Sequence, residues 1–294
     1  MKDEECIRFL QWALPVLGKR WQGYRKVRRQ VCKRISRRLF DLGLAGSDDY
    51  RRYMQADPHE WARLDRLCRV TISRFYRDRG VFDRIGSDVL PVIARGVLQN
   101  NERGIRCWSV GCGSGEEPYT LAMIWNLALR QACQGLTLEI VATDSDPTVI
   151  KRARQGVYPV SSLKELPEPW LAAAFVKRGQ MYCLKPMFGE QVTFLVQDIR
   201  QTPPAGNFHM ILCRNLVFTY FSQEMQEEVF VGIDTALPAG GVLVIGVHEK
   251  LPASASHFEQ WVANMPIFRK SRISNTRPNV IKQSSDGNQP IYPK

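Results

Sequence analysis

The sequence lacks the features that mark membrane, secreted and metal-binding proteins. No apolar run approaches the roughly 18 residues that a membrane span needs, and the first residues, MKDEECIRFLQW, lack the basic-then-apolar order of a secretion signal. The 8 cysteines form no CxxC pair or zinc-ligand spacing, and the 4 histidines have no partner pattern. Most cysteines lie in apolar stretches, so we expect reduced core thiols in a cytoplasmic protein without a metal site.

One stretch of the chain contains no acidic residue. Residues 19–38, KRWQGYRKVRRQVCKRISRR, hold ten basic residues, and residues 1–80 hold 20 Lys/Arg against 10 Asp/Glu. Such charge attracts nucleic acid or an acidic protein surface, although a solvated helix face would also carry it. Aromatic residues interleave with these charges only at Trp21 and Tyr24, which is sparse for a nucleic-acid site.

Hydrophobic periodicity divides the chain into three parts. Residues 1–80 show the three-and-four spacing of helices and lack alternating strand patterns. From about residue 104, short apolar runs alternate with helical segments, which indicates a doubly wound parallel sheet. This rhythm breaks between residues 160 and 191, where MYCLKPMF and VTFLVQD could form an antiparallel excursion. We expect a helical domain over 1–80, an α/β domain over 81–275 with an insert at about 160–195, and a flexible tail over 276–294.

A glycine-rich loop follows the first apolar run of the α/β part, in WSVGCGSGEEPYTLAM. The spacing of Gly111, Gly113 and Gly115 is tighter than a dinucleotide fingerprint and lacks the GK[ST] ending of a phosphate loop. The glutamates that follow, Glu116 and Glu117, would repel phosphate and favour a positively charged ligand such as S-adenosylmethionine. Asp144, at the end of the next run, suits the ribose hydroxyls, as it would in a NAD site. A plain tight turn with acids at a helix start is the structural alternative.

Four motifs give the chain a family resemblance. GCGSGEEPYTLAM resembles the GEEPY loop of the chemotaxis-receptor (CheR-type) methyltransferases, and CRNLVFTYF resembles their CRN-x3-YF motif. TISRFYRD resembles the segment that joins their helical and catalytic domains, and PAGGVLVIGVHEKL resembles their PGG…GHSE strand. The order and spacing of these motifs agree with the family over roughly residues 5–270.

This resemblance implies a fold, a cofactor and a reaction. The family has a helical amino-terminal domain, a class I (Rossmann-like) α/β methyltransferase domain and a small inserted β-subdomain. It transfers a methyl group from S-adenosylmethionine to glutamate side chains of chemoreceptors, giving γ-methyl esters and S-adenosylhomocysteine. By position, the resemblance makes Arg77 and Tyr220 catalytic, and assigns cofactor binding to Thr71, Ser73, Arg77, Gly111, Gly113, Gly115, Glu117, Asp144, Asp198, Ile199, Asn215 and Leu216.

The chain departs from the family in three motifs. Its glycine loop is more like a general methyltransferase loop than the A-G-C-S-T-G that is common in the family. Thr71 and Ser73 stand where the family usually has Asn and Thr. Tyr220 comes five residues after Asn215 instead of four, so either a one-residue bulge restores Tyr220 to the site or Thr219 takes its place. The ordinary structural roles would be a surface ion pair of Arg77 with Asp78 or Asp83, and a core position for Tyr220.

Three hypotheses on function stay open. The first is a protein-glutamate O-methyltransferase acting on an acidic, receptor-like helical protein; a carboxylate is already ionised at neutral pH and needs no general base. The second is a methyltransferase for another acceptor, such as nucleic acid or a small acid. The basic segment favours nucleic acid, while the absence of an NPPY tetrapeptide and of a PCQ-type nucleophile opposes it. The third is a non-catalytic, cofactor-binding regulator. We expect no membrane insertion, no nucleic-acid partner and a monomer.

Overall fold

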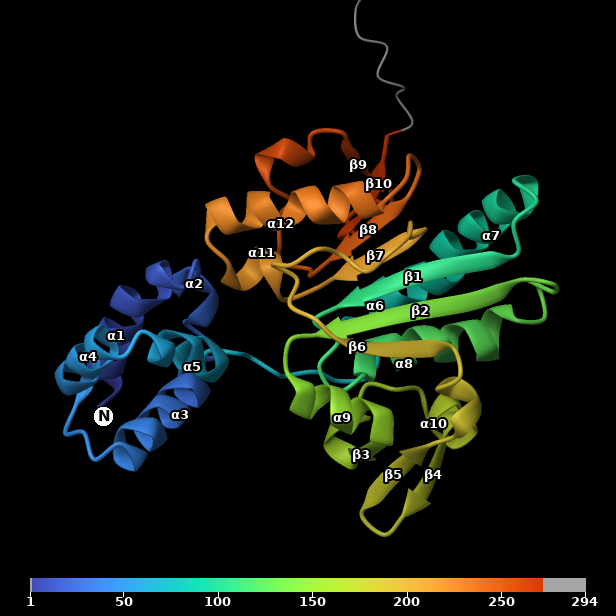
Figure 1. The fold of residues 1–294 in the computed structure, drawn as a ribbon. Helices are drawn as coiled ribbons and strands as arrows, with labels where there is room; N and C mark the ends of the chain where they lie inside the picture. The colour runs from blue at the N-terminus through green and yellow to red at the C-terminus, as the bar shows by residue number, and fades with distance from the viewer. Residues whose placement is uncertain (1, 272–294) are drawn as a thin grey trace, which may run out of the picture.

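The computed structural model describes residues 2–271 and begins with a group of helices. These are α1 (Asp3–Val16), α2 (Trp21–Tyr24), α3 (Arg28–Asp41), α4 (Ser47–Ala56) and α5 (His59–Leu67). On α3, Val31, Ile35 and Leu39 recur every four residues and are buried, and they pack against α1 in a core of their own. The helices lie to one side of the sheet (Figure 1). The predicted helical character of this part is confirmed, whereas the predicted tail at 276–294 lies outside the described residues.

The prediction that all eight cysteines are free thiols is wrong. Cys6 on α1 and Cys32 on α3 form a disulfide, with their Cα atoms 5.9 Å apart. The two cysteines are separated by 26 residues, and only the packing of α1 against α3 brings them together, so no local spacing reveals the pair. The other six, all within the described part of the chain, are free.

A seven-stranded sheet forms the centre of the molecule (Figure 1). Its order is β6 (Val192–Val196), β2 (Thr137–Asp144), β1 (Gly104–Val110), β7 (Met210–Cys213), β8 (Val242–Ile245), β10 (Ile267–Lys270) and β9 (Phe258–Gln260). The strands from β6 to β8 are parallel, and β10 and β9 close the far edge in antiparallel pairing. The expected α/β architecture with a mostly parallel sheet is confirmed.

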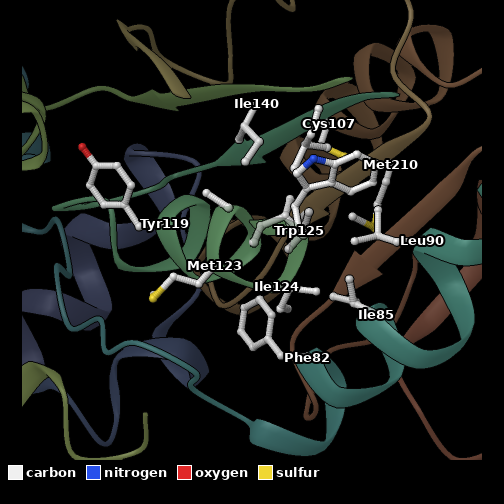
Figure 2. Close-up of a cluster of buried hydrophobic side chains, with 14 of the residues drawn as sticks. Phe82, Ile85, Leu90, Cys107, Tyr119, Met123, Ile124, Trp125, Ile140 and Met210 are labelled. Carbon is white, nitrogen blue, oxygen red and sulfur yellow. The ribbon is translucent and has the colours of Figure 1, made fainter. Parts of the chain in front are cut away.

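Helices cover both faces of this sheet. One face carries α6 (Arg79–Arg84), α7 (Leu90–Gln99), α8 (Glu116–Ile124) and α9 (Pro147–Gln155); the other carries α11 (Val217–Tyr220) and α12 (Gln223–Ala236). Alternate residues of β1 enter the two layers, because Cys107 belongs to the α8 core and Trp108 to the α12 core. The first layer is dense around α8, whose Tyr119, Met123 and Ile124 belong to one buried cluster with Ile140 of β2 and Phe82 of α6 (Figure 2).

Short irregular helices complete the fold. Ile85–Val89 and Trp125–Leu129 are π-helical turns that extend α6 and α8. The 3₁₀ turns are Val160–Ser162, Pro186–Phe188 and Ala253–Ala255. Within residues 2–271, no helix is both long and apolar enough to cross a bilayer.

A small antiparallel sheet interrupts the alternation of strands and helices. It consists of β3 (Val157–Pro159), β5 (Met181–Leu184) and β4 (Phe175–Arg178), with α10 (Glu168–Ala174) before β4. MYCL is therefore in the antiparallel excursion, as expected. The idea that VTFLVQD joins it is wrong, because β6 pairs in parallel with β2 over Val192–Val196. The apolar run alone did not distinguish these two partners.

Candidate functional site

A cavity lies where the parallel strands of the central sheet end. Loops after β1, β2, β6 and β7 line it, together with the segment 68–77 that joins α5 to the sheet. Ligands of open α/β sheets bind at this edge, outside the carboxyl ends of the strands. The structure places twelve of the thirteen predicted residues in the lining: Thr71, Ser73, Arg77, Gly111, Gly113, Glu117, Asp144, Asp198, Ile199, Asn215, Leu216 and Tyr220.

The glycine loop owes its shape to backbone torsions that other residues rarely adopt. Gly111 has φ +66°, and a Cβ there would lie 2.5 Å from Leu216 Cδ2. Gly113 has φ +56°, and a Cβ there would lie 3.8 Å from Ser73 Cβ. Its amide donates to Asp144 Oδ2 at 3.0 Å, which fastens the loop to the end of β2.

Gly115 is the predicted residue that the structure does not bring into the cavity lining. It has φ +91° and precedes α8. A Cβ there would lie 3.0 Å from the Tyr119 ring and 3.1 Å from Ala153 Cβ. The structure thus gives Gly115 a packing role, because the missing Cβ permits the close approach of α8 and α9 below the loop. Its cofactor-binding role stays a prediction. Glu116 is likewise buried outside the lining, and of the two glutamates only Glu117 faces the cavity.

Three carboxylates mark the sheet side of the cavity. Asp144 accepts hydrogen bonds from the Gly113 and Asp146 amides, and burial raises its pKa. Burial also raises the pKa of Glu117, which accepts from Ser109 Oγ at 2.8 Å and from Arg214 Nη1 at 3.1 Å. Burial alone would raise the pKa of Asp198, but hydrogen bonds from Arg200 hold it below the usual value.

The linker segment 68–77 brings basic side chains to the cavity, Arg69, Arg74 and Arg77. Arg77 is half-buried, and its Nη1 donates to the Ile72 carbonyl at 3.0 Å. Within residues 2–271, neither Asp78 nor Asp83 forms the ion pair with Arg77 that was its expected structural alternative. Asp78 pairs with Arg214, and Asp83 pairs with Arg79. The guanidinium of Arg77 is thus available to a ligand carboxylate.

Tyr220 lies in the cavity lining, whereas Thr219 does not. The Thr219 hydroxyl instead donates to Glu249, and the Tyr220 ring packs 5.1 Å from the ring of Tyr24. Tyr220 is the last residue of the helical turn α11, which begins two residues after Asn215. Of the two alternatives, the structure thus restores Tyr220 to the site.

Two functional side chains were missed because each works through other groups. Arg214 is 3% exposed and donates to Glu117, to Asp78 and to the Arg77 carbonyl. Glu249 accepts from the Asn215 and Gly246 amides and holds Asn215 at φ +55°. Arg214 lies in the CRN motif and Glu249 in the VHEK segment, and their place in these motifs is the sequence feature that could have indicated them. Side chains of the helical part also reach the cavity: Lys19, Tyr24, Asp65 and Arg69.

The donor set of this cavity fits S-adenosylmethionine. Carboxylates and a bare glycine backbone on the sheet side suit a sulfonium, an ammonium and ribose hydroxyls, and they would repel a phosphate group. Arginines on the linker side suit the methionine carboxylate. Asp144 and Asp198 would hold the nucleoside end, and Glu117 with Arg77 the amino-acid end.

Comparisons with known proteins agree with this site. Residues 71–266 match the family model of the CheR methyltransferase, SAM binding domain. A chemotaxis protein methyltransferase of Listeria monocytogenes is 33% identical over 63% of this chain and 67% of its own length. Chemotaxis protein methyltransferase 2 of Pseudomonas aeruginosa is 31% identical over 77% of this chain and 80% of its own length.

Two further matches are more limited: one relative is much longer than this chain, and one solved structure has low sequence identity. An uncharacterized 104.1 kDa protein of Rhodobacter capsulatus is 30% identical over 82% of this chain, which spans only 25% of that protein. A solved TehB-like methyltransferase of Corynebacterium glutamicum aligns with 60% of this chain and 84% of its own at TM-score 0.34 and 18% identity. The family match covers every strand of the sheet except β10 and most of the cavity lining, and it gives S-adenosylmethionine as the cofactor. The chain belongs to the CheR methyltransferase family.

Proposed function

We propose that this protein transfers the methyl group of S-adenosylmethionine to glutamate side chains of an acidic, chemoreceptor-like protein, forming γ-glutamyl methyl esters. The observation that carries the proposal is the meeting of Arg77 and Tyr220, from two distant motifs, in the cavity of the glycine loop. The names of the relatives, chemotaxis protein methyltransferases, support the receptor as acceptor.

The chemistry of the lining agrees with a carboxylate acceptor. The cofactor supplies an activated methyl group on a sulfonium, and the acceptor carboxylate is ionised at neutral pH without a base. Among the described residues, the lining includes no histidine. The protein therefore has to orient the carboxylate and exclude water from it. We assign orientation to Arg77 and the wall of the methyl channel to Tyr220.

The charge of the helical part supports an acidic partner. A groove between α3 and α5 is lined by five cationic side chains and one acid: Lys33, Arg34, Arg37, Arg38, Arg63 and Asp41. Three of the cations are held by contacts within the chain, Arg38 by Glu60, Arg37 by Asp41 and Arg34 by backbone carbonyls. Such a surface would attract an acidic receptor helix at long range.

The proposal includes a division of labour along the chain. We assign the helical domain, residues 1–80, to partner recognition, with its linker residues Thr71, Ser73 and Arg77 contributing to the site, and we assign residues 81–275 to cofactor binding and methyl transfer. Separate hydrophobic cores for the helices and for the sheet support this division.

A labelling experiment tests the proposed function. The protein is incubated with methyl-labelled S-adenosylmethionine and an acidic receptor cytoplasmic fragment, and the product is treated with mild base. We expect labelled methanol from the wild type and none from Arg77→Ala. Base-stable label, or label on added nucleic acid instead, would favour another acceptor. Cofactor binding without any transfer would favour a non-catalytic regulator.

A further inference from the structure

The amino-terminal helices dock directly on the turn that carries Tyr220. Residues 18–24 run beside residues 218–222, although about two hundred positions separate them in the sequence. The Ser222 amide donates to the Gly18 carbonyl at 2.8 Å, and the Arg20 amide donates to the Tyr220 carbonyl at 2.9 Å. Lys19 and Phe221 form an antiparallel bridge between these two hydrogen bonds. An isolated β-bridge with its two flanking hydrogen bonds thus joins the helical part to the turn that carries Tyr220.

The side chain of Arg20 adds a second set of contacts. Its Nε donates to the Thr219 carbonyl at 3.1 Å, and its Nη2 donates to the Phe218 carbonyl. The last carbonyls of a helix have no partner within the helix. For α11, one residue supplies partners for three of them in succession, Phe218, Thr219 and Tyr220. The cation also lies at the negative end of the turn, where positive charge is favoured.

Gly23 permits this close approach. A Cβ on Gly23 would lie 2.2 Å from the Thr219 carbonyl oxygen and 3.2 Å from Tyr220 Cα. These neighbours are backbone atoms, so the turn itself would have to move. Tyr24, the next residue, packs its ring against that of Tyr220.

We propose that Arg20 is a positioning residue for Tyr220, and that the segment 18–24 is a working part of the methyl-transfer site. Arg20 fixes the turn 218–221, and Gly23 lets the two backbones meet, so that the Tyr220 side chain points into the cavity. The proposal rests on the proposed function, since Tyr220 is assigned there to the methyl channel. It also gives one cation of the basic stretch a role inside the molecule.

A second contact between the helical part and the sheet allows the effect of Arg20 on the turn to be distinguished from its effect on the attachment of the helical part. Asp65 on α5 pairs with both Lys19 and Arg200, and Arg200 also pairs with Asp198 after β6. Loss of the Arg20 side chain leaves this contact in place. Arg20 variants should therefore loosen the turn while the helical part stays attached.

Two measurements on the full chain test the proposal. Hydrogen exchange of the peptide that covers residues 217–223 reports on the turn, and steady-state kinetics with the receptor fragment report on catalysis. The variants are Arg20→Ala, Arg20→Lys and Gly23→Ala. The controls are Gln22→Ala, an exposed neighbour on α2, and Gly96→Ala, a helical glycine with open space around it.

We expect faster exchange and a fall in kcat of about 10- to 100-fold for Arg20→Ala and Gly23→Ala, because small misplacements of site residues slow catalysis strongly. Cofactor affinity, measured by calorimetry, should stay within about threefold, because the glycine loop and Asp144 are untouched. Arg20→Lys should recover only part of kcat, since an ammonium lacks the planar fork that reaches two carbonyls. The controls should behave as wild type.

Three results would overturn the proposal: unchanged exchange in Arg20→Ala, faster exchange with unchanged kcat, or equal losses in cofactor affinity and kcat. Failure of the proposed function looks different. In that case the wild type itself transfers no methyl group to the receptor fragment. The exchange measurement then decides by itself whether Arg20 fixes the turn.

Discussion

At the scale of single residues, Arg214 is the hub of the site. Its side chain is 3% exposed and joins Glu117 at 3.1 Å to Asp78 at 2.7 Å, with its guanidinium 4.8 Å from the centre of the Phe82 ring. Removing one partner of a buried charge cluster leaves the others uncompensated. We expect Arg214→Met to lower the free energy of unfolding by about 3–5 kcal/mol.

Denaturant unfolding measures this effect, with Arg95→Met as the control because Arg95 is exposed on α7. A loss below about 1 kcal/mol, the size expected of a surface ion pair, would contradict the role of Arg214 as a buried hub.

Asp144 predicts a pH dependence of cofactor binding. Burial holds its pKa above the usual 3.8, although the Gly113 and Asp146 amides oppose the shift. Protonation removes the charge and one acceptor, so cofactor affinity should fall as the pH falls through this raised pKa. The stability of the free protein has the opposite sign. A carboxyl with a raised pKa contributes stability below its unfolded value, and that contribution is lost as the pH rises through the folded one.

Calorimetry between neutral and acidic pH, together with thermal unfolding of the free protein, checks both signs. Asp144→Asn should weaken cofactor binding at neutral pH and flatten part of its pH dependence, with Glu139→Asn as an exposed control. An affinity that begins to fall only near the pH of an ordinary aspartate would count against Asp144 as a buried cofactor ligand.

At the scale of elements, Gly115 separates packing from binding. We expect Gly115→Ala to destabilise the protein by more than about 1 kcal/mol, because its left-handed torsion and the contacts with Tyr119 and Ala153 both oppose a Cβ. Gly43→Ala is the matched control, since Gly43 also has positive φ but open surroundings. Cofactor affinity should not change.

Thermal unfolding and calorimetry of the two variants make the comparison. If Gly115→Ala were as stable as Gly43→Ala but bound the cofactor more weakly, then Gly115 would be a cofactor-binding residue, as its place in the motif predicts.

The elements also show what sequence can and cannot predict. The strand that ends at Asp144 and the strand that precedes Asn215 were recognisable as apolar runs, and the parallel sheet followed from their alternation with helices. The partner of β6 was not, because an apolar run of five residues fits two sheets equally. The turn α11 restores Tyr220 through backbone geometry that a residue count between motifs does not contain.

At the scale of the whole molecule, contacts between segments far apart in the sequence account for the features that could not be predicted. Three such contacts join distant segments: the disulfide of Cys6 with Cys32, the hydrogen bonds of Arg20 to carbonyls, and the hydrogen bonds of the buried Arg214. The cavity residues were predictable because their motifs are local. The groups that hold them are scattered along the chain and meet only in the fold.

The basic surface leads to a prediction about the partner. Reversing two exposed charges of α3, with Lys33→Glu and Arg37→Glu together, should lower kcat/KM for an acidic receptor fragment by about tenfold at low salt. The difference should shrink as salt is added, because screening shortens the reach of the field to about 3 Å at 1 M.

Arg95→Glu and Arg103→Glu together, at exposed positions in and just after α7, are the control for the same change of charge. Equal losses for both surfaces, or a loss that does not depend on salt, would mean that α3 does not guide the partner.

The central claim is that glutamate side chains receive the methyl group. Peptide mass spectrometry of the receptor fragment, after incubation with the protein and S-adenosylmethionine, tests it most directly. We predict single methyl additions on glutamate residues that disappear after mild base treatment and do not form with Arg77→Ala. Methyl groups on other side chains, or additions that survive base, would contradict the account.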